Sequence, residues 1–216
     1  MNENKAFYST IGSDKTFSRD VAYDKRNIEA ICDNILSLKL GAGGQWLDIG
    51  CGVGMLAKLC DRVGLKYVGL DLASKNIPQN RDWEFVESDF VEYETDRRFS
   101  LITLISTLHH FEDQEKVLEK AYGLLEPGGV IYIDNELTHP YSEVIRLYYR
   151  LRGQGHLLDT VEIKLGRTWP PKGEVIYHYD FFFMKRIFNV GLPDTKLKLL
   201  SFIYPSWRCY IRKAPN

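Results

Sequence analysis

Three glycines at alternate positions, Gly50, Gly52 and Gly54, constrain the fold of this chain more than any other feature. They separate the short apolar run QWLDI at 45–49 from the segment MLAKLCDRVG at 55–64, whose apolar residues recur at helical spacing. Glycine has no Cβ atom, so the backbone can turn sharply there and come close to another group. A strand that turns through such glycines into a helix begins a βαβ unit. The chain is therefore predicted to contain a parallel sheet with a ligand site at this turn.

Strand and helix patterns alternate from residue 45 to residue 136. Further strands are predicted at 66–71, 83–89, 99–106 and 130–134. The run at 99–106 is almost continuously apolar, which is typical of a parallel strand covered on both faces. Asp113 is expected to cap a helix that Pro127-Gly128-Gly129 stops before the fifth strand. This alternation predicts a doubly wound α/β sheet.

Two β-rich runs, at 195–204 and 206–214, end the sequence and meet at Pro205-Ser206. A connection this short implies an antiparallel hairpin, because parallel neighbours need a long crossover. The sheet is therefore expected to have seven strands, mostly parallel, with helices on both faces and an antiparallel last strand.

The alternation breaks between residues 137 and 178. A helix is predicted at about 141–152, and glycines and prolines then mark a loop. Another helix is expected to begin at Asp180. At 216 residues the chain has the length of one α/β domain. We interpret 1–216 as a single domain and 137–178 as an insertion after the fifth strand.

Charge is unevenly distributed, although the net charge is only −1. Residues 1–136 hold 15 Lys and Arg against 23 Asp and Glu, whereas residues 137–216 hold 13 against 6. A net charge near zero argues against bulk attraction to nucleic acid, so no nucleic-acid partner is expected. The basic C-terminal part either faces an anionic partner or is a solvated surface.

Location and redox state follow from what the sequence lacks. No apolar run approaches the roughly 20 residues of a membrane-spanning helix, so stable membrane insertion is not expected. No secretory signal is visible, which predicts a cytoplasmic protein. The cysteines have neither zinc-site nor disulfide spacing, so free thiols are expected at Cys32, Cys51, Cys60 and Cys209.

The glycine spacing and a neighbouring acid discriminate between two cofactor classes. A dinucleotide site uses GxGxxG/A, but counting from Gly50 places the bulky Met55 at the third small position. The motif here is GxGxG. Asp48, at the end of the preceding strand, would repel a pyrophosphate and attract the ammonium and sulfonium groups of S-adenosylmethionine. The pattern favours S-adenosylmethionine as the cofactor over NAD.

Carboxylates also follow the next two strands. Asp71 ends the second strand, where it can accept both ribose hydroxyls of a nucleoside. Asp89 follows the third strand and can accept from the adenine amine, with Leu72 and Phe90 offering apolar contact to the base. Each acid could instead be a loop or cap residue. Their place at successive strand ends favours ligand binding.

The motifs LDIGCGVG, GLDLA, ESDF, LISTLHHF and LLEPGGVIYI, within about 45–136, resemble those of the class I methyltransferases in order and spacing. The resemblance implies the strand order 3-2-1-4-5-7-6 and an N-terminal helical cap, 1–44, with candidate lid residues Tyr8, Phe17 and Tyr23. It also implies that the methionine portion is lined by Gly50, Gly52 and Gly54, with Ser106 near its end, that Asp71 holds the ribose, and that Asp89 and Phe90 hold the adenine. Asp48, Cys51 and Leu72 complete the predicted S-adenosylmethionine contacts.

Candidate catalytic residues follow the fourth strand. Methyl transfer is an in-line displacement that depends mainly on alignment and exclusion of water, and an alcohol or phenol benefits from a base. His109 and His110 are the candidate bases, although both could serve packing. Asp134, Asn135 and Glu136 could hold a divalent cation, but no metal is expected, because the rest of such a site is not apparent.

A small-molecule acceptor is the favoured substrate, because the insertion 137–178 is too short for a separate recognition domain. It is expected to act as a lid on the acceptor side, with Tyr177-His178-Tyr179 as candidate contacts. One alternative is methylation of RNA or protein through the basic C-terminal part. A second is a non-catalytic S-adenosylmethionine-binding scaffold or lipid-surface protein, with 141–152 as an interfacial helix. An NAD-dependent oxidoreductase is the least favoured alternative.

Overall fold

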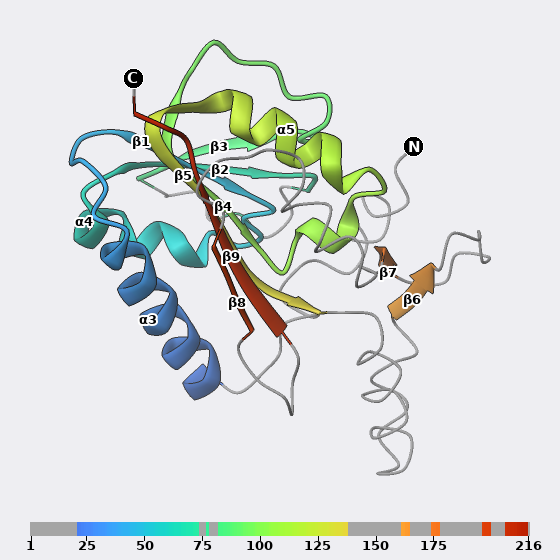
Figure 1. Cartoon of the computed structure of the whole chain (residues 1–216). Helices are drawn as coiled ribbons and strands as arrows, with labels where there is room; N and C mark the ends of the chain where they lie inside the picture. The colour runs from blue at the N-terminus through green and yellow to red at the C-terminus, as the bar shows by residue number, and fades with distance from the viewer. Residues whose placement is uncertain are drawn as a thin grey trace.

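A seven-stranded sheet forms the centre of the computed structural model (Figure 1). The structure describes residues 21–73, 77, 82–137, 161–164, 174–177, 196–199 and 206–215. The sheet contains β1 (Gln45–Ile49), β2 (Lys66–Asp71), β3 (Glu84–Glu87), β4 (Phe99–Ile105), β5 (Leu125–Leu137), β8 (Lys196–Leu199) and β9 (Ser206–Arg212).

The strand order is β3-β2-β1-β4-β5-β9-β8, which is the predicted order 3-2-1-4-5-7-6. The first five strands pair in parallel, and β9 runs antiparallel to both β5 and β8. The predicted fold class and the C-terminal hairpin are therefore confirmed. Because the five strands are parallel, their carboxyl ends meet at one edge, where ligands bind in such sheets.

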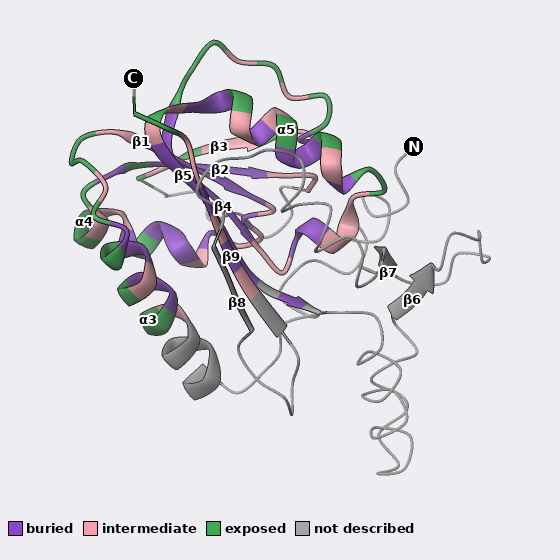
Figure 2. Ribbon diagram, viewed as in Figure 1, coloured by how far each residue is buried: buried purple, intermediate pink, exposed green. Residues whose placement is uncertain are grey.

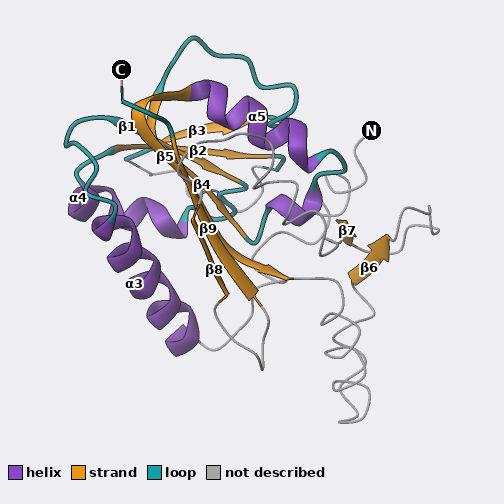
Figure 3. Ribbon diagram, viewed as in Figure 1, coloured by secondary structure: helices purple, strands orange, loops and turns teal. Residues whose placement is uncertain are grey.

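Helices cover both faces of the sheet, as Figure 3 shows. They are α3 (Val21–Ser37), η1 (Met55–Leu59), α4 (Cys60–Val63), η2 (Leu108–His110) and α5 (Gln114–Leu124). Asp113 caps α5 as predicted, since its Oδ1 accepts from the Lys116 backbone N–H at 3.1 Å. The helix predicted at 55–64 is divided into a 3₁₀ turn, η1, and a single α-helical turn, α4, which ends at Gly64 with φ 74°. No described helix has the length and apolar character to cross a membrane.

Two hydrophobic cores lie on opposite faces of the sheet. Leu47 and Ile49 of β1 pack with α5, whereas Trp46 packs with α3 and η1. This division follows from the alternation of side chains along a strand. β4 is buried from Phe99 to Leu104, in keeping with its apolar sequence (Figure 2). β4 thus has no solvated face over these residues.

The fifth strand is longer than the sequence predicted. β5 begins at Leu125, directly after α5, so Pro127-Gly128-Gly129 lies within the strand and not before it. Gly128 donates its N–H to the carbonyl of Lys213, and Lys213 donates to the carbonyl of Gly129. The expectation of a strand confined to 130–134 was wrong, because pairing with the chain end extends β5.

The segment 137–178 contains two short strands that the sequence analysis did not predict. β6 (Val161–Lys164) and β7 (Glu174–Tyr177) pair in parallel as a separate sheet. β7 lies against η2, which follows the carboxyl end of β4. The predicted helices at 141–152 and after Asp180 lie outside the described residues, as do Tyr8, Phe17, His178 and Tyr179.

A buried polar network joins the three central strands. Thr103 of β4 donates from Oγ1 to Asp48 Oδ1 at 2.5 Å and accepts from Trp46 Nε1 at 2.8 Å. Tyr67 of β2 donates its hydroxyl to the other oxygen of Asp48. All four side chains are at most 5% exposed. Each polar group finds its partner within the network, so loss of one member leaves buried atoms unsatisfied.

The substitution Thr103→Val keeps the side-chain shape but removes the hydroxyl. We expect it to lower the free energy of unfolding by about 2–4 kcal/mol, because Trp46 Nε1 and Asp48 Oδ1 both lose a buried partner. Ile102→Val, at the adjacent buried position, is the control and is expected to cost about 0.5–1.5 kcal/mol. Urea unfolding measures both. Equal losses in the two variants would show that the network adds no stability.

Burial also makes Asp48 a source of pH-dependent stability. Desolvation raises the pKa of Asp48 from 3.8 to about 6, against the opposing hydrogen bonds from Thr103 and Tyr67. A raised folded-state pKa means that the protonated form stabilises the fold, and this stabilisation is lost as the pH rises from about 4 through 6. The wild type should therefore lose on the order of 3 kcal/mol over this interval relative to Asp48→Asn. Parallel stability–pH curves for the two proteins would contradict this assignment.

Candidate active site

The glycine loop is tied to the end of the second strand. Gly52 donates its backbone N–H to Asp71 Oδ2 at 2.8 Å, and Ala73 donates to Asp71 Oδ1 at 3.2 Å. Burial raises the pKa of Asp71, while these backbone donors and the charge of His110 oppose the rise. The structure thus brings together Asp71 and the glycine loop, as the sequence predicted, and places His110 on the same side.

All three loop glycines have the positive φ that favours glycine: 71° at Gly50, 54° at Gly52 and 74° at Gly54. Two of them also make room for side chains of the protein. A Cβ atom on Gly50 would lie 2.4 Å from Thr107 Cγ2, and one on Gly54 would lie 2.2 Å from Trp83 Cζ2. At these two positions, close packing within the protein is a second reason for glycine that sequence reasoning missed.

Asp48 and Cys51 lie on the protein side of the loop. Both carboxylate oxygens of Asp48 accept from hydroxyls inside the sheet, so the geometry favours a supporting role over direct contact with a ligand ammonium. Cys51 is buried, and desolvation raises the pKa of its thiol well above the usual value. Cys51 is therefore a neutral thiol that packs beneath the loop.

The candidate cofactor contacts that follow β2 and β3 differ in burial: Leu72 and Asp89 are half-buried, and Phe90 is buried in the core. Leu72 is half-buried directly after Asp71, and Asp89 is half-buried after β3, where its Oδ1 accepts from the Val91 backbone N–H at 3.0 Å. Phe90 is only 1% exposed and packs edge-on against Phe111 at 6.4 Å. The Phe90 ring thus belongs to the hydrophobic core, and its predicted apolar contact with the base stays a prediction.

The loop after β4 is fixed by the end of β5. Ser106 has φ 52°, and its N–H donates to the carbonyl of Asp134 at 3.0 Å. Glu136 is fully buried, and its Oε1 accepts from the backbone N–H groups of Thr107 at 2.8 Å and Leu108 at 2.9 Å. Its Oε2 lies 2.7 Å from His109 Nδ1. The carboxylate therefore holds both the start of η2 and the His109 ring.

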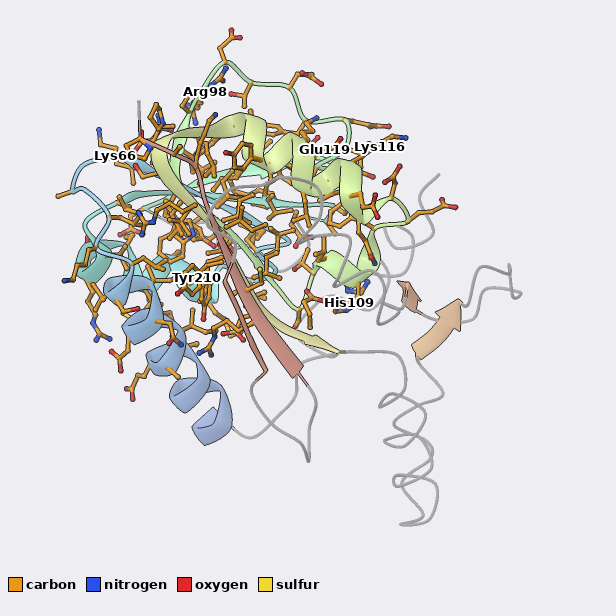
Figure 4. All side chains as sticks on the ribbon, in the orientation of Figure 1. Lys66, Arg98, His109, Lys116, Glu119 and Tyr210 are labelled. Atoms are coloured by element: carbon orange, nitrogen blue, oxygen red, sulfur yellow. The ribbon has the colours of Figure 1, made fainter. Side chains whose placement is uncertain are left out.

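The two candidate bases lie side by side, with ring centroids 4.2 Å apart. His109 bonds to Glu136, and the charge of His110 helps to lower the pKa of Asp71 against the rise caused by burial. Burial alone would raise the pKa of Glu136, but His109 and the backbone donors hold it below its usual value. Glu136 is thus ionised at neutral pH. Figure 4 shows the His109 side chain on the side of the molecule where β7 lies.

The acids at the end of β5 already have protein partners. Arg208 of β9 donates from Nε to Asp134 Oδ2 at 2.7 Å, and Tyr132 donates its hydroxyl to the same oxygen at 2.5 Å. Glu136 is paired with His109. No group of three potential metal ligands occurs among the described residues. Sequence reasoning missed the pairing roles of Glu136 and Arg208, because both partners come from distant segments.

Gly54→Ala tests how tightly the glycine loop is packed. We expect a loss of about 2–4 kcal/mol in unfolding free energy, from left-handed backbone strain and the clash with Trp83, which Tyr67 holds in place at 5.3 Å. Gly43→Ala is the matched control, because Gly43 has φ 84° with no neighbour within 4 Å, and about 1–2 kcal/mol is expected there. Denaturant unfolding compares the two, and equal losses would contradict the packing role.

Curated proteins are similar in sequence to about half of this chain. Ubiquinone biosynthesis O-methyltransferase from Albidiferax ferrireducens is 28% identical over 117 residues, 49% of this chain and 46% of that protein. The mitochondrial enzyme of the same name from Dictyostelium discoideum is 29% identical over 125 residues, 49% of this chain and 39% of that protein. The chain thus spans less than half the length of these relatives.

Solved structures share the whole fold at low sequence identity. Magnesium protoporphyrin IX methyltransferase from Synechocystis, with bound SAH, has a TM-score of 0.64 and 12% identity, covering 97% of this chain and 98% of that one. N-methyltransferase NodS from Bradyrhizobium japonicum, in complex with S-adenosyl-L-homocysteine, has a TM-score of 0.58 and 14% identity, covering 99% of each chain.

A family model described as a methyltransferase domain matches residues 23–188. This match includes the glycine loop, Asp71, Asp89, the η2 histidines and Glu136. Together with the strand order of the sheet, it establishes that the chain belongs to the methyltransferase domain family and has the class I fold.

Proposed function

We propose that this protein transfers the methyl group of S-adenosylmethionine to a hydroxyl group of a small-molecule acceptor. The observation that carries the proposal is the hydrogen bond between Gly52 and Asp71 at the carboxyl edge of the sheet, next to the histidines of η2. A glycine turn beside a strand-end carboxylate fits a nucleoside with a cationic tail and does not suit a pyrophosphate. The family match supports this cofactor class.

Each proposed cofactor contact uses a group at this edge. Asp71 would hold the ribose hydroxyls, with Leu72 beside the base. Asp89 would accept from the adenine amine, and Phe90 would make apolar contact with the base. The remaining proposed contacts, near the methionine portion, are backbone groups of Gly50, Cys51, Gly52, Gly54 and Ser106, with Asp48 supporting the loop from below.

The cofactor supplies an electrophilic methyl group on a positively charged sulfur. The chain's own contribution is to align the acceptor, to exclude water and to accept the acceptor's proton. Glu136 and Asp71 fix the two loops that flank the reacting region. Packing of Thr107 against Gly50 joins those loops, so the distance between donor and acceptor sides is set by protein contacts.

Three observations support an oxygen acceptor of small size. The relatives named above are O-methyltransferases. A histidine with a buried carboxylate partner suits removal of a proton from a hydroxyl group. β7 lies against η2, so 137–178 is proposed as the lid over the acceptor. Residues 1–44 are proposed as the cap over the cofactor.

The four free thiols are consistent with a cytoplasmic location.

Transfer itself is tested with S-adenosylmethionine labelled in its methyl group. The intact protein is incubated with a panel of phenols, carboxylic acids and primary amines, and labelled products are identified by mass spectrometry. Label on phenol oxygens is expected. Label on amines alone would contradict the oxygen assignment, and no cofactor binding at all would overturn the proposed function.

The role of Asp71 is tested by Asp71→Ala. We expect the dissociation constant for S-adenosylmethionine to rise more than about tenfold, or about 1.5 kcal/mol, because charge-assisted hydrogen bonds to the ribose are lost. Glu87→Ala is the control, since Glu87 is an exposed acid paired in register with Asp71 on the neighbouring strand, and it should bind as the wild type does. Equilibrium dialysis measures both. Unchanged affinity in folded Asp71→Ala would reject the ribose role.

A further inference from the structure

We propose that Glu136 is a positioning residue that keeps the His109 proton on Nδ1, so that Nε2 is the atom that accepts a proton from the acceptor hydroxyl. This inference rests on the proposed function and deepens it by assigning one histidine and one ring nitrogen. The structure shows His109 bonded through Nδ1 to the buried carboxylate of Glu136, and the assignment rests on this bond.

Glu136 cannot turn away from the His109 ring. Its Oε1 accepts two backbone N–H groups, from Thr107 at 2.8 Å and Leu108 at 2.9 Å, and these fix the carboxylate plane. Its Oε2 then lies 2.7 Å from His109 Nδ1. The Glu136 side chain has no exposed surface, so solvent does not compete for this oxygen. The ring is therefore held by a carboxylate that two backbone donors fix.

An ionised carboxylate selects one tautomer of the ring. Carboxylate oxygens only accept hydrogen bonds, so the nitrogen 2.7 Å from Oε2 must carry a proton. In neutral His109 that nitrogen is Nδ1, and Nε2 keeps its lone pair. The lowered pKa of Glu136 agrees with an ionised carboxylate. The titratable side chains described around His109 are Glu136 from β5 and His110 from η2, and His110 in turn faces Asp71.

The opposite nitrogen of His109 is available for proton transfer. Within the described part of the chain, the contacts of His109 are the Glu136 bond and the adjacent His110 ring, neither of which uses Nε2 as a hydrogen-bond acceptor. The His109 side chain is 16% exposed, and β7 lies against η2 on this side (Figure 4). His109 is thus partly exposed.

The resulting step is balanced in atoms and charge. The acceptor O–H bond breaks and its proton goes to His109 Nε2, while the acceptor oxygen forms a bond to the methyl carbon. The bond between that carbon and the sulfonium sulfur breaks, and the sulfur keeps the electron pair and becomes neutral. His109 becomes an imidazolium beside ionised Glu136, which stabilises the positive charge as it forms.

Nitrogen-15 NMR of the free protein tests the tautomer without cofactor or acceptor. At a pH where His109 is neutral, the wild type is expected to show a protonated Nδ1 and an unprotonated Nε2. In Glu136→Gln the amide oxygen must still accept from Thr107 and Leu108, so its NH₂ group faces the ring and the proton should move to Nε2. Asp134→Asn, an equally buried acid two residues earlier on β5, should leave the His109 tautomer unchanged. A wild-type proton on Nε2 would overturn the proposal.

A kinetic measurement separates positioning from simple packing. With catechol as the probe acceptor, Glu136→Gln is expected to lower kcat by about 100-fold or more and to change KM by less than about threefold. An unchanged kcat, or an equal fall in Asp134→Asn, would overturn the positioning role. The NMR result does not depend on methyl transfer, so failure of this inference and failure of the proposed function are distinguishable.

Discussion

Carboxylates that accept backbone N–H groups organise the carboxyl edge of this sheet. Asp71, at the end of β2, binds Gly52 of the loop after β1, and Glu136, at the end of β5, binds Thr107 and Leu108 of the loop after β4. Glu136 is fully buried and Asp71 is half-buried, so both carboxylates need fixed donors, and each loop needs acceptors for its N–H groups. The mutual requirement places two loops from separate parts of the chain at defined positions. Contact between Thr107 and Gly50 then joins them.

This arrangement gives the edge two chemically different sides. Around Asp71 are the glycine turn and half-buried Leu72, and the carboxylate of Asp71 makes this side acidic. Around Glu136 is a histidine whose outer nitrogen is directed away from its carboxylate partner. His109 and His110 are neighbours on one tight 3₁₀ turn, with ring centroids 4.2 Å apart. Glu136 holds His109, while the charge of His110 acts on Asp71. A donor site and an acceptor site can therefore meet at one short helix.

Local sequence patterns predicted most of the fold. The apolar runs located β1 and β2 to the residue, and the short C-terminal connection predicted the antiparallel hairpin that the sheet contains. Patterns failed where long-range pairing decided the outcome: β5 begins at Leu125 because Leu125 pairs with Phe99 of β4, and Gly128 and Gly129 bond to Lys213. β6 and β7 were missed because four-residue strands among glycines and prolines leave little periodic signal.

The candidate site was predictable at the level of strand ends but not of side-chain direction. Asp71 and the glycine loop lie together as expected, whereas the Phe90 ring points into the core and Asp48 is enclosed by Thr103 and Tyr67. Sequence position alone cannot give the partner of Glu136, which is 27 residues away in His109. Such pairs depend on which strands are neighbours, and that follows only from the assembled sheet.

Calorimetric titration of the intact protein with S-adenosylmethionine, and separately with NADH, tests the central claim most directly. The glycine turn and Asp71 predict micromolar binding of S-adenosylmethionine, about −8 kcal/mol, and no binding of NADH. Binding of NADH in place of S-adenosylmethionine, or of neither ligand, would contradict the account.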